Sequence, residues 1–162
     1  AALEDLERHA LRKADAADAL NEALRCPSVM ALRAAVDEGD EVGLSEEWLT
    51  VARSVLRGES QKALARKILS VQVEDCQDPH PLLEVIADAR AAGLPDDELS
   101  TAKAHCMELV RRLCLEAAAE REILGMREAL DLASRAELLG GDAAFQRCAG
   151  ELDQAEREER AR

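Results

Sequence analysis

Aromatic residues are almost absent from this 162-residue chain, which has one Trp, one Phe and no Tyr. Gly and Pro are also scarce, with 8 and 4 residues, and they fall mostly between segments with a helical pattern. Hydrophobic residues still make up 48% of the chain, so its apolar material is mainly Ala, Leu and Val, which suit closely packed helices. Charged residues, at 34%, are numerous enough to coat the outer faces of those helices. The composition predicts an all-α protein.

Basic residues are outnumbered, with 21 Lys and Arg against 34 Asp and Glu, which gives a net charge of −13. A nucleic-acid-binding protein needs a basic surface to displace counterions, and an anionic membrane surface repels an acidic chain. No apolar run is long enough to span a bilayer or to form a signal-peptide core. We therefore expect neither nucleic-acid binding nor membrane insertion. Because the chain begins Ala1-Ala2 with no Met, we also expect a fragment or a processed product.

Five cysteines occur, an odd number without the spacing of a secreted disulfide framework. Cys106 and Cys114 fall at apolar helical positions, where a thiol packs like a slightly larger Ala. We therefore expect the cytoplasm or another reducing compartment.

The hydrophobic pattern predicts about seven helices. A leading helix covers residues 1–25, where apolar residues recur at helical spacing at Leu3, Leu6, Ala10, Ala17, Leu20 and Leu24. Three helical hairpins follow, at residues 28–69, 78–121 and 123–157, with turns at Gly43-Leu44, Gly93-Leu94 and Gly140-Gly141. Gly58 is a candidate position for a kink or break, because Gly costs about 1 kcal/mol relative to Ala inside a helix.

The first two hairpins align at a shift of 50 residues. The aligned pairs include Leu32 with Leu82, Val36 with Ile86, Gly43-Leu44 with Gly93-Leu94, Leu49 with Leu99, and Ala52 with Ala102. A period of this length is typical of stacked αα-hairpins that bury their apolar faces on one another. We therefore predict one all-helical domain over residues 1–162, built of antiparallel hairpins stacked as a short repeat array. A single up-down helical bundle would show much of the same pattern and is the alternative.

In architecture this pattern resembles the HEAT-like and TPR-like helical-hairpin scaffolds, and the resemblance covers nearly the whole chain. It is a resemblance of architecture only, since the Trp-Leu-Gly and Ala-Phe-Pro positions of a TPR are absent and no HEAT consensus is matched. The resemblance implies binding of other proteins and no chemistry of its own.

The first candidate site is an apolar stripe on the helix that follows Ser45, formed by Trp48, Val51 and Val55 and called here the Trp48 stripe. Its equivalents in the second hairpin are polar, namely Glu98, Thr101 and His105. Trp is the residue most enriched in the hot spots of protein interfaces. Either a partner protein or the long first helix is expected to cover this stripe.

The second candidate site consists of Cys76, His80, His105 and Cys106. Folding the second hairpin about its turn brings these four side chains towards one another, and thiolate and imidazole are zinc ligands. The spacing matches no usual metal signature, however, and the adjacent His105 and Cys106 diverge by about 100° around a helix. We expect ordinary core or surface residues here, with no metal and no cofactor.

Catalytic motifs are not apparent in the sequence. There is no G-x-S-x-G motif, no Gly-rich phosphate loop after a strand and no paired Glu-x-x-His motif, so we expect no enzymatic activity. Two Glu/Arg-rich segments, EREI at 120–123 and EREERAR at 156–162, are candidate partner-binding tails or else solvated helix faces.

The hypothesis that these observations favour is a non-enzymatic scaffold for protein–protein interaction, a piece or subunit of a larger assembly whose partner is another protein or a second copy. One alternative is a self-associating structural helical bundle. The other is a metal-stabilised regulatory domain.

Overall fold

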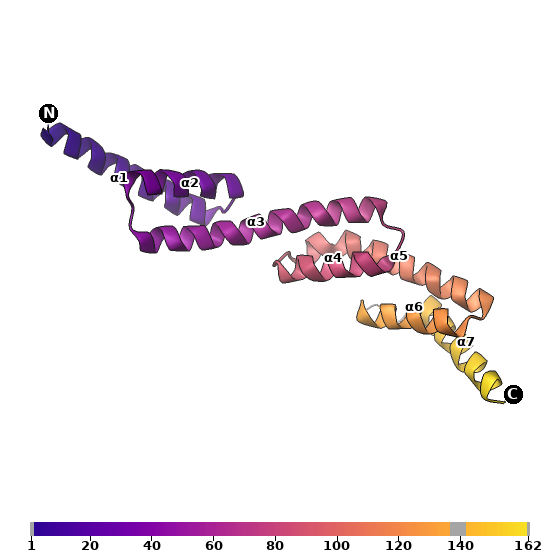
Figure 1. Ribbon diagram of the computed structural model, residues 1–162. Helices are drawn as coiled ribbons and strands as arrows, with labels where there is room; N and C mark the ends of the chain where they lie inside the picture. Colours follow the sequence, from indigo (N-terminus) through magenta and orange to yellow (C-terminus); the bar gives the residue numbers. More distant parts are fainter. Residues whose placement is uncertain (1, 137–141, 162) are drawn as a thin grey trace. The chain divides into compact units, whose positions relative to one another are not determined.

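The computed structural model describes residues 2–136 and 142–161, and these ranges contain seven helices and no strand (Figure 1). The helices are α1 (Ala2–Arg25), α2 (Val29–Val42), α3 (Glu46–Asp75), α4 (Pro79–Ala91), α5 (Asp96–Glu120), α6 (Ile123–Arg135) and α7 (Ala143–Arg160). The all-α prediction is confirmed, and consecutive helices pack as in a helical array. The turn predicted at Gly140-Gly141 lies outside the described residues. No helix in the described ranges has a segment apolar enough to cross a membrane.

The 50-residue repeat is visible in the way the hairpins begin. Ser28 precedes α2, and its side chain accepts a hydrogen bond from the backbone N–H of Ala31 at 3.2 Å. Asp78 occupies the equivalent position before α4, and its carboxylate accepts from the N–H of His80 at 3.0 Å. Each side chain satisfies one of the N–H groups that a helix start leaves unpaired, so both hairpins begin with the same capping device.

The turns inside these hairpins are also equivalent. Gly43 and Gly93 both adopt left-handed backbone conformations, with φ values of 68° and 85°. The next residue then returns a hydrogen bond to the helix, from Leu44 N–H to the Gly39 carbonyl at 2.9 Å and from Leu94 N–H to the Ala89 carbonyl at 3.1 Å. Only Gly takes a positive φ without a steric cost from a Cβ, so the predicted turn positions are confirmed and explained.

Helix α3 differs from the prediction in its length. It continues without interruption through Gly58 and ends at Asp75, whereas the sequence pattern placed its end at residue 69. No Gly or Pro occurs between Gly58 and Pro79, so nothing in that stretch forces the helix to stop. Residues 70–77, which lie between the first two predicted hairpins, are therefore mostly helix, and only Cys76, Gln77 and Asp78 connect α3 to α4.

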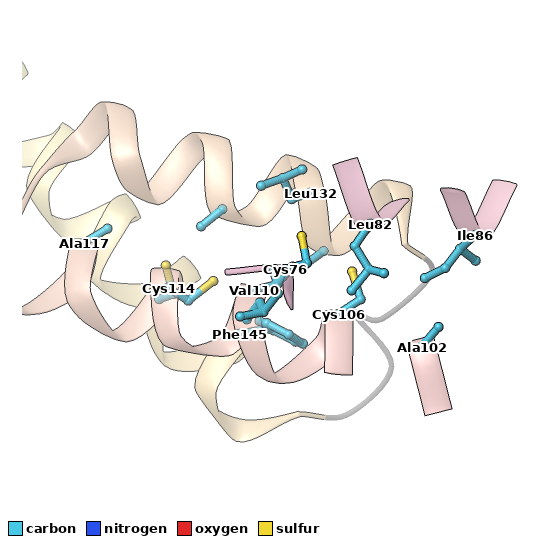
Figure 2. Packing of buried hydrophobic residues seen from close by; sticks show 14 of the residues in the cluster. Cys76, Leu82, Ile86, Ala102, Cys106, Val110, Cys114, Ala117, Leu132 and Phe145 are labelled. Atoms are coloured by element: carbon cyan, nitrogen blue, oxygen red, sulfur yellow. The ribbon is translucent and has the colours of Figure 1, made fainter. Parts of the chain in front are cut away.

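Within the predicted single domain, the packing divides the chain into two compact units, residues 1–64 and residues 65–162. The core of the first unit combines α1, α2 and the start of α3, through Leu20, Ala23, Leu32, Ala35, Val36, Leu49 and Ala52. The larger core of the second unit runs from the end of α3 to α7, and Figure 2 shows its side chains, including Leu82, Cys106, Val110, Leu132 and Phe145.

Helix α1 is buried only in its second half, where Ala16, Leu20 and Ala23 face α2. Residues 4–15 are exposed throughout, and Leu6 and Leu11 expose 68% and 63% of their surface. The predicted leading helix is confirmed, but the apolar residues Leu6 and Ala10 in its first half are not buried. The reason is the difference in length between the two helices. Helix α2 has 14 residues and α1 has 24, so α2 folds back along only the last turns of α1.

The boundary between the two units has a cause in the repeat itself. On α5, four buried residues build the core shared with α6 and α7, namely Leu109, Val110, Cys114 and Ala117. Their equivalents on α3 are Glu59, Ser60, Leu64 and Lys67, of which the first two are half-buried and the last two exposed. Two of these four side chains are charged, so burying them in an apolar core would be costly. At three of these four positions α3 lacks the apolar residues by which α5 packs against α6 and α7.

Candidate functional site

The Trp48 stripe lies open on the first unit. Trp48 and Val51 expose 47% and 56% of their surface, and Val55 is half-buried against the core of that unit. On the other side of the same helical turns, Leu49 and Ala52 are fully packed inside. The first helix therefore does not cover Trp48 and Val51. These two side chains form an exposed apolar surface on a helix whose opposite side is packed into the core of the first unit.

An ion-pair network holds this end of α3 against α2. Arg53 Nη2 donates to Asp40 Oδ1 at 2.6 Å, and Arg53 Nη1 donates to Glu46 Oε1 at 2.7 Å. The hydrogen bond to Asp40 is the main cause that raises the pKa of Arg53 above its ordinary value. These side chains are all substantially exposed, so each pair contributes little to stability, and the packing of Leu49 and Ala52 is what anchors the turns that carry Trp48.

The structure does not assemble the four candidate metal ligands into one site. His105 Nε2 donates a hydrogen bond to the Cys76 backbone carbonyl at 3.1 Å, and the Cys76 thiol donates to the Asp78 carbonyl at 2.8 Å. Cys106 is buried, and loss of solvation raises its pKa to about 11, with a smaller contribution from Cys76. His80 is exposed at the start of α4. In the described ranges, no group of three or more His, Cys, Asp or Glu side chains is placed to hold a metal ion.

The two Glu/Arg-rich segments are not tails. The EREI segment forms the tight connection between α5 and α6, where Arg121 adopts a left-handed conformation with φ of 55°. Residues 156–160 of the second segment belong to α7, in which Glu156 accepts from Arg127 at 2.6 Å and Glu158 accepts from Arg121 at 3.2 Å. Both segments therefore serve the packing of α7 against its neighbours.

Sequence reasoning missed a groove of about 320 Å³ on the second unit. It lies between the last turns of α5 and the start of α6, and its lining includes four glutamates, Glu116, Glu120, Glu122 and Glu128. The sequence did contain a signal for an acidic surface here, because Glu116 and Glu120 are one helical turn apart and Glu122 and Glu128 follow within eight residues. The position of the turn that folds α6 back onto α5 was needed to place all four together.

No protein-family model, curated protein sequence or solved structure matches this chain. Its function must therefore be inferred from its own residues.

Proposed function

We propose that this protein is a non-enzymatic scaffold that binds another protein through the Trp48 stripe, as a piece or subunit of a larger assembly. The observation that carries the proposal is the exposure of Trp48 and Val51 on a helix whose opposite side is packed into the core. Because the helix that carries Trp48 is already folded and packed, little backbone ordering is needed when a partner covers the side chain. The polar residues at the equivalent positions of α5, Glu98 and Thr101, support a role that is specific to α3.

The charge and the cysteines narrow the class of partner and the compartment. A net charge of −13 opposes binding to nucleic acid, so the proposed partner is a protein. All five cysteines are free, and four of them are buried, which is the arrangement expected of a protein that works in a reducing compartment.

The test is affinity purification with tagged protein, comparing the wild type with Trp48→Ala and Val51→Lys. The matched control is Leu124→Ala, which also removes an exposed apolar side chain but lies on α6 in the second unit. We expect a defined set of proteins to be lost with both stripe variants and retained by the control. A purified candidate should then shift the emission of the single Trp to shorter wavelength. The proposal fails if no protein depends on the stripe, or if bound proteins leave Trp48 emission unchanged.

Self-association is the second candidate, because the same stripe could be buried against its counterpart on another copy. Sedimentation of the isolated protein over a wide concentration range separates the two possibilities. A mass that rises with concentration in the wild type, and stays monomeric in Trp48→Ala, would favour a self-associating structural bundle. A monomer at every concentration leaves the binding of a different protein.

A further inference from the structure

The groove between α5 and α6 has an apolar floor. The floor is formed by Leu113, Ala117, Ala129 and Leu132, and the last three of these are buried by the surrounding helices. Its volume of about 320 Å³ lies at the lower end of the range for ligand pockets, which is enough for one or two apolar side chains of a larger ligand. His80, at the start of α4, completes the lining at one side.

The rim of this groove is acidic, and most of its charge is not neutralised by basic side chains within the described ranges. Glu116 has one cation nearby, Arg112 at 4.0 Å, and both side chains are exposed. Glu120, Glu122 and Glu128 form no ion pair within the described ranges. Elsewhere on the same helices carboxylates do find Arg partners, as Glu108 does with Arg111 at 2.5 Å. Three of the four carboxylates around the apolar floor therefore have no cation partner within the described ranges, and the fourth, Glu116, has only the long, exposed pair with Arg112.

We propose that this groove binds a basic amphipathic segment of a partner protein, with apolar side chains on the floor and Lys or Arg side chains against the glutamates. The acidic rim attracts positive charge, and the apolar floor accepts apolar side chains. A ligand that fits the groove therefore carries both basic and apolar side chains. A second copy of the chain is a poor occupant, because two molecules of charge −13 repel each other. The inference rests on the proposed function because it assumes a scaffold that binds other proteins. It adds a second binding surface, separate from the Trp48 stripe, and the class of partner that fits it.

Peptide binding to the full-length protein tests this proposal directly. The peptide used is a fluorescein-labelled peptide of about 18 residues, five helical turns, with Leu and Ala on one face and Lys on the others. A scrambled peptide of the same composition removes the apolar face but keeps the charge, and a third peptide carries Glu in place of Lys. We expect saturable binding of the first peptide, weakening of about tenfold or more for the scrambled one, and none for the acidic one.

Two triple variants remove the same amount of negative charge, one at the rim of the groove and the other outside it. Glu120→Gln/Glu122→Gln/Glu128→Gln neutralises the rim, whereas Asp37→Asn/Glu38→Gln/Asp88→Asn neutralises three exposed carboxylates outside the groove. We expect the rim variant to weaken binding by about tenfold or more and the control to change it by less than about twofold, because nearby charges act far more strongly than screened distant ones. When the amphipathic peptide is added to the wild-type protein, the backbone amide chemical shifts of residues around Leu113 and Ala129 should change.

Two results would overturn the proposal. One is equal weakening by both triple variants, which would indicate attraction by overall charge alone. The other is equal binding of the amphipathic and scrambled peptides, which would mean that the apolar floor takes no part. Trp48→Ala should leave peptide binding unchanged, and the rim variant should retain any protein captured through the Trp48 stripe, so failure of this proposal is distinguishable from failure of the scaffold function.

Discussion

Arg111 on α5 and Asp142 at the start of α7 are joined by two hydrogen bonds, from Nη2 at 2.6 Å and from Nε at 3.2 Å, both to Asp142 Oδ2. The other carboxylate oxygen accepts from the Ala144 backbone N–H at 2.8 Å and so caps α7. One side chain thus begins a helix and ties it to its neighbour. The hydrogen bond with Arg111 is the main reason that the pKa of Asp142 lies below its ordinary value.

Asp142→Asn should therefore lower the free energy of unfolding at neutral pH by an amount that shrinks in acid. A carboxylate with a lowered folded-state pKa contributes its full stabilisation above the unfolded-state value, near 3.8, and loses it as pH falls through the folded-state value. Urea unfolding of both proteins from about pH 7 to about pH 3 measures this difference. Asp131→Asn, an exposed change on α6, is the control and should alter stability little at any pH. A constant difference across the pH range would contradict the assignment.

Gly43 and Gly58 should respond to Ala substitution with opposite signs. Gly43 has a φ of 68°, and a Cβ there meets nothing within 4 Å, so Gly43→Ala should cost about 1 kcal/mol through backbone strain alone. Gly58 lies inside α3 in equally open surroundings, so Gly58→Ala should stabilise the protein by about 0.5–1 kcal/mol. Urea unfolding followed by circular dichroism measures both. A destabilising Gly58→Ala would mean that α3 needs flexibility at that point.

Leu32 and Leu82 provide a test of the division into two units. They are equivalent in the repeat and both fully buried, so each Leu→Ala change should cost about 2–5 kcal/mol within its own core. The single Trp lies in the first unit and reports only on that unit. We expect Leu32→Ala to lower the unfolding midpoint seen by Trp48 fluorescence and Leu82→Ala to leave it unchanged. Equal shifts in both variants would instead show one cooperative folding unit.

Thiol reactivity should follow burial. Cys26 is exposed, whereas burial raises the pKa of Cys106 to about 11 and that of Cys114 to about 12. Because the thiolate is the reactive form, a disulfide reagent such as dithionitrobenzoate should label one thiol rapidly in the native protein and five after unfolding. Cys26→Ser should remove the rapid phase. Rapid labelling of a second cysteine would reveal local opening of a core.

Much of the fold was predictable from local sequence signals. The capping residues Ser28 and Asp78 and the turn glycines Gly43 and Gly93 act through their own backbone neighbourhood, so their positions could be read without knowing the tertiary structure. The length of α3 differs from the prediction because residues 70–77 are mainly polar, although this stretch contains no Gly or Pro that would end a helix.

The candidate surfaces were less predictable, because they depend on what covers each side chain. The spacing of Trp48, Val51 and Val55 was apparent, but their exposure was not, since an apolar stripe looks the same whether it is covered or open. Cys26 and Cys76 occupy equivalent positions in the repeat, yet the first is exposed and the second is buried. Equivalent sequence positions acquire different surroundings when only one of them meets a neighbouring helix.

By itself, the sequence determined the helices, their caps, the turns and the 50-residue repeat, because all of these depend on interactions between residues near one another in the chain. Only the tertiary structure decided that the packing divides into two units after Leu64, that Trp48 is exposed, and that four glutamates lie around an apolar groove. Each of these features is set by packing between helices, and packing is determined by the shapes and charges of residues far apart in sequence.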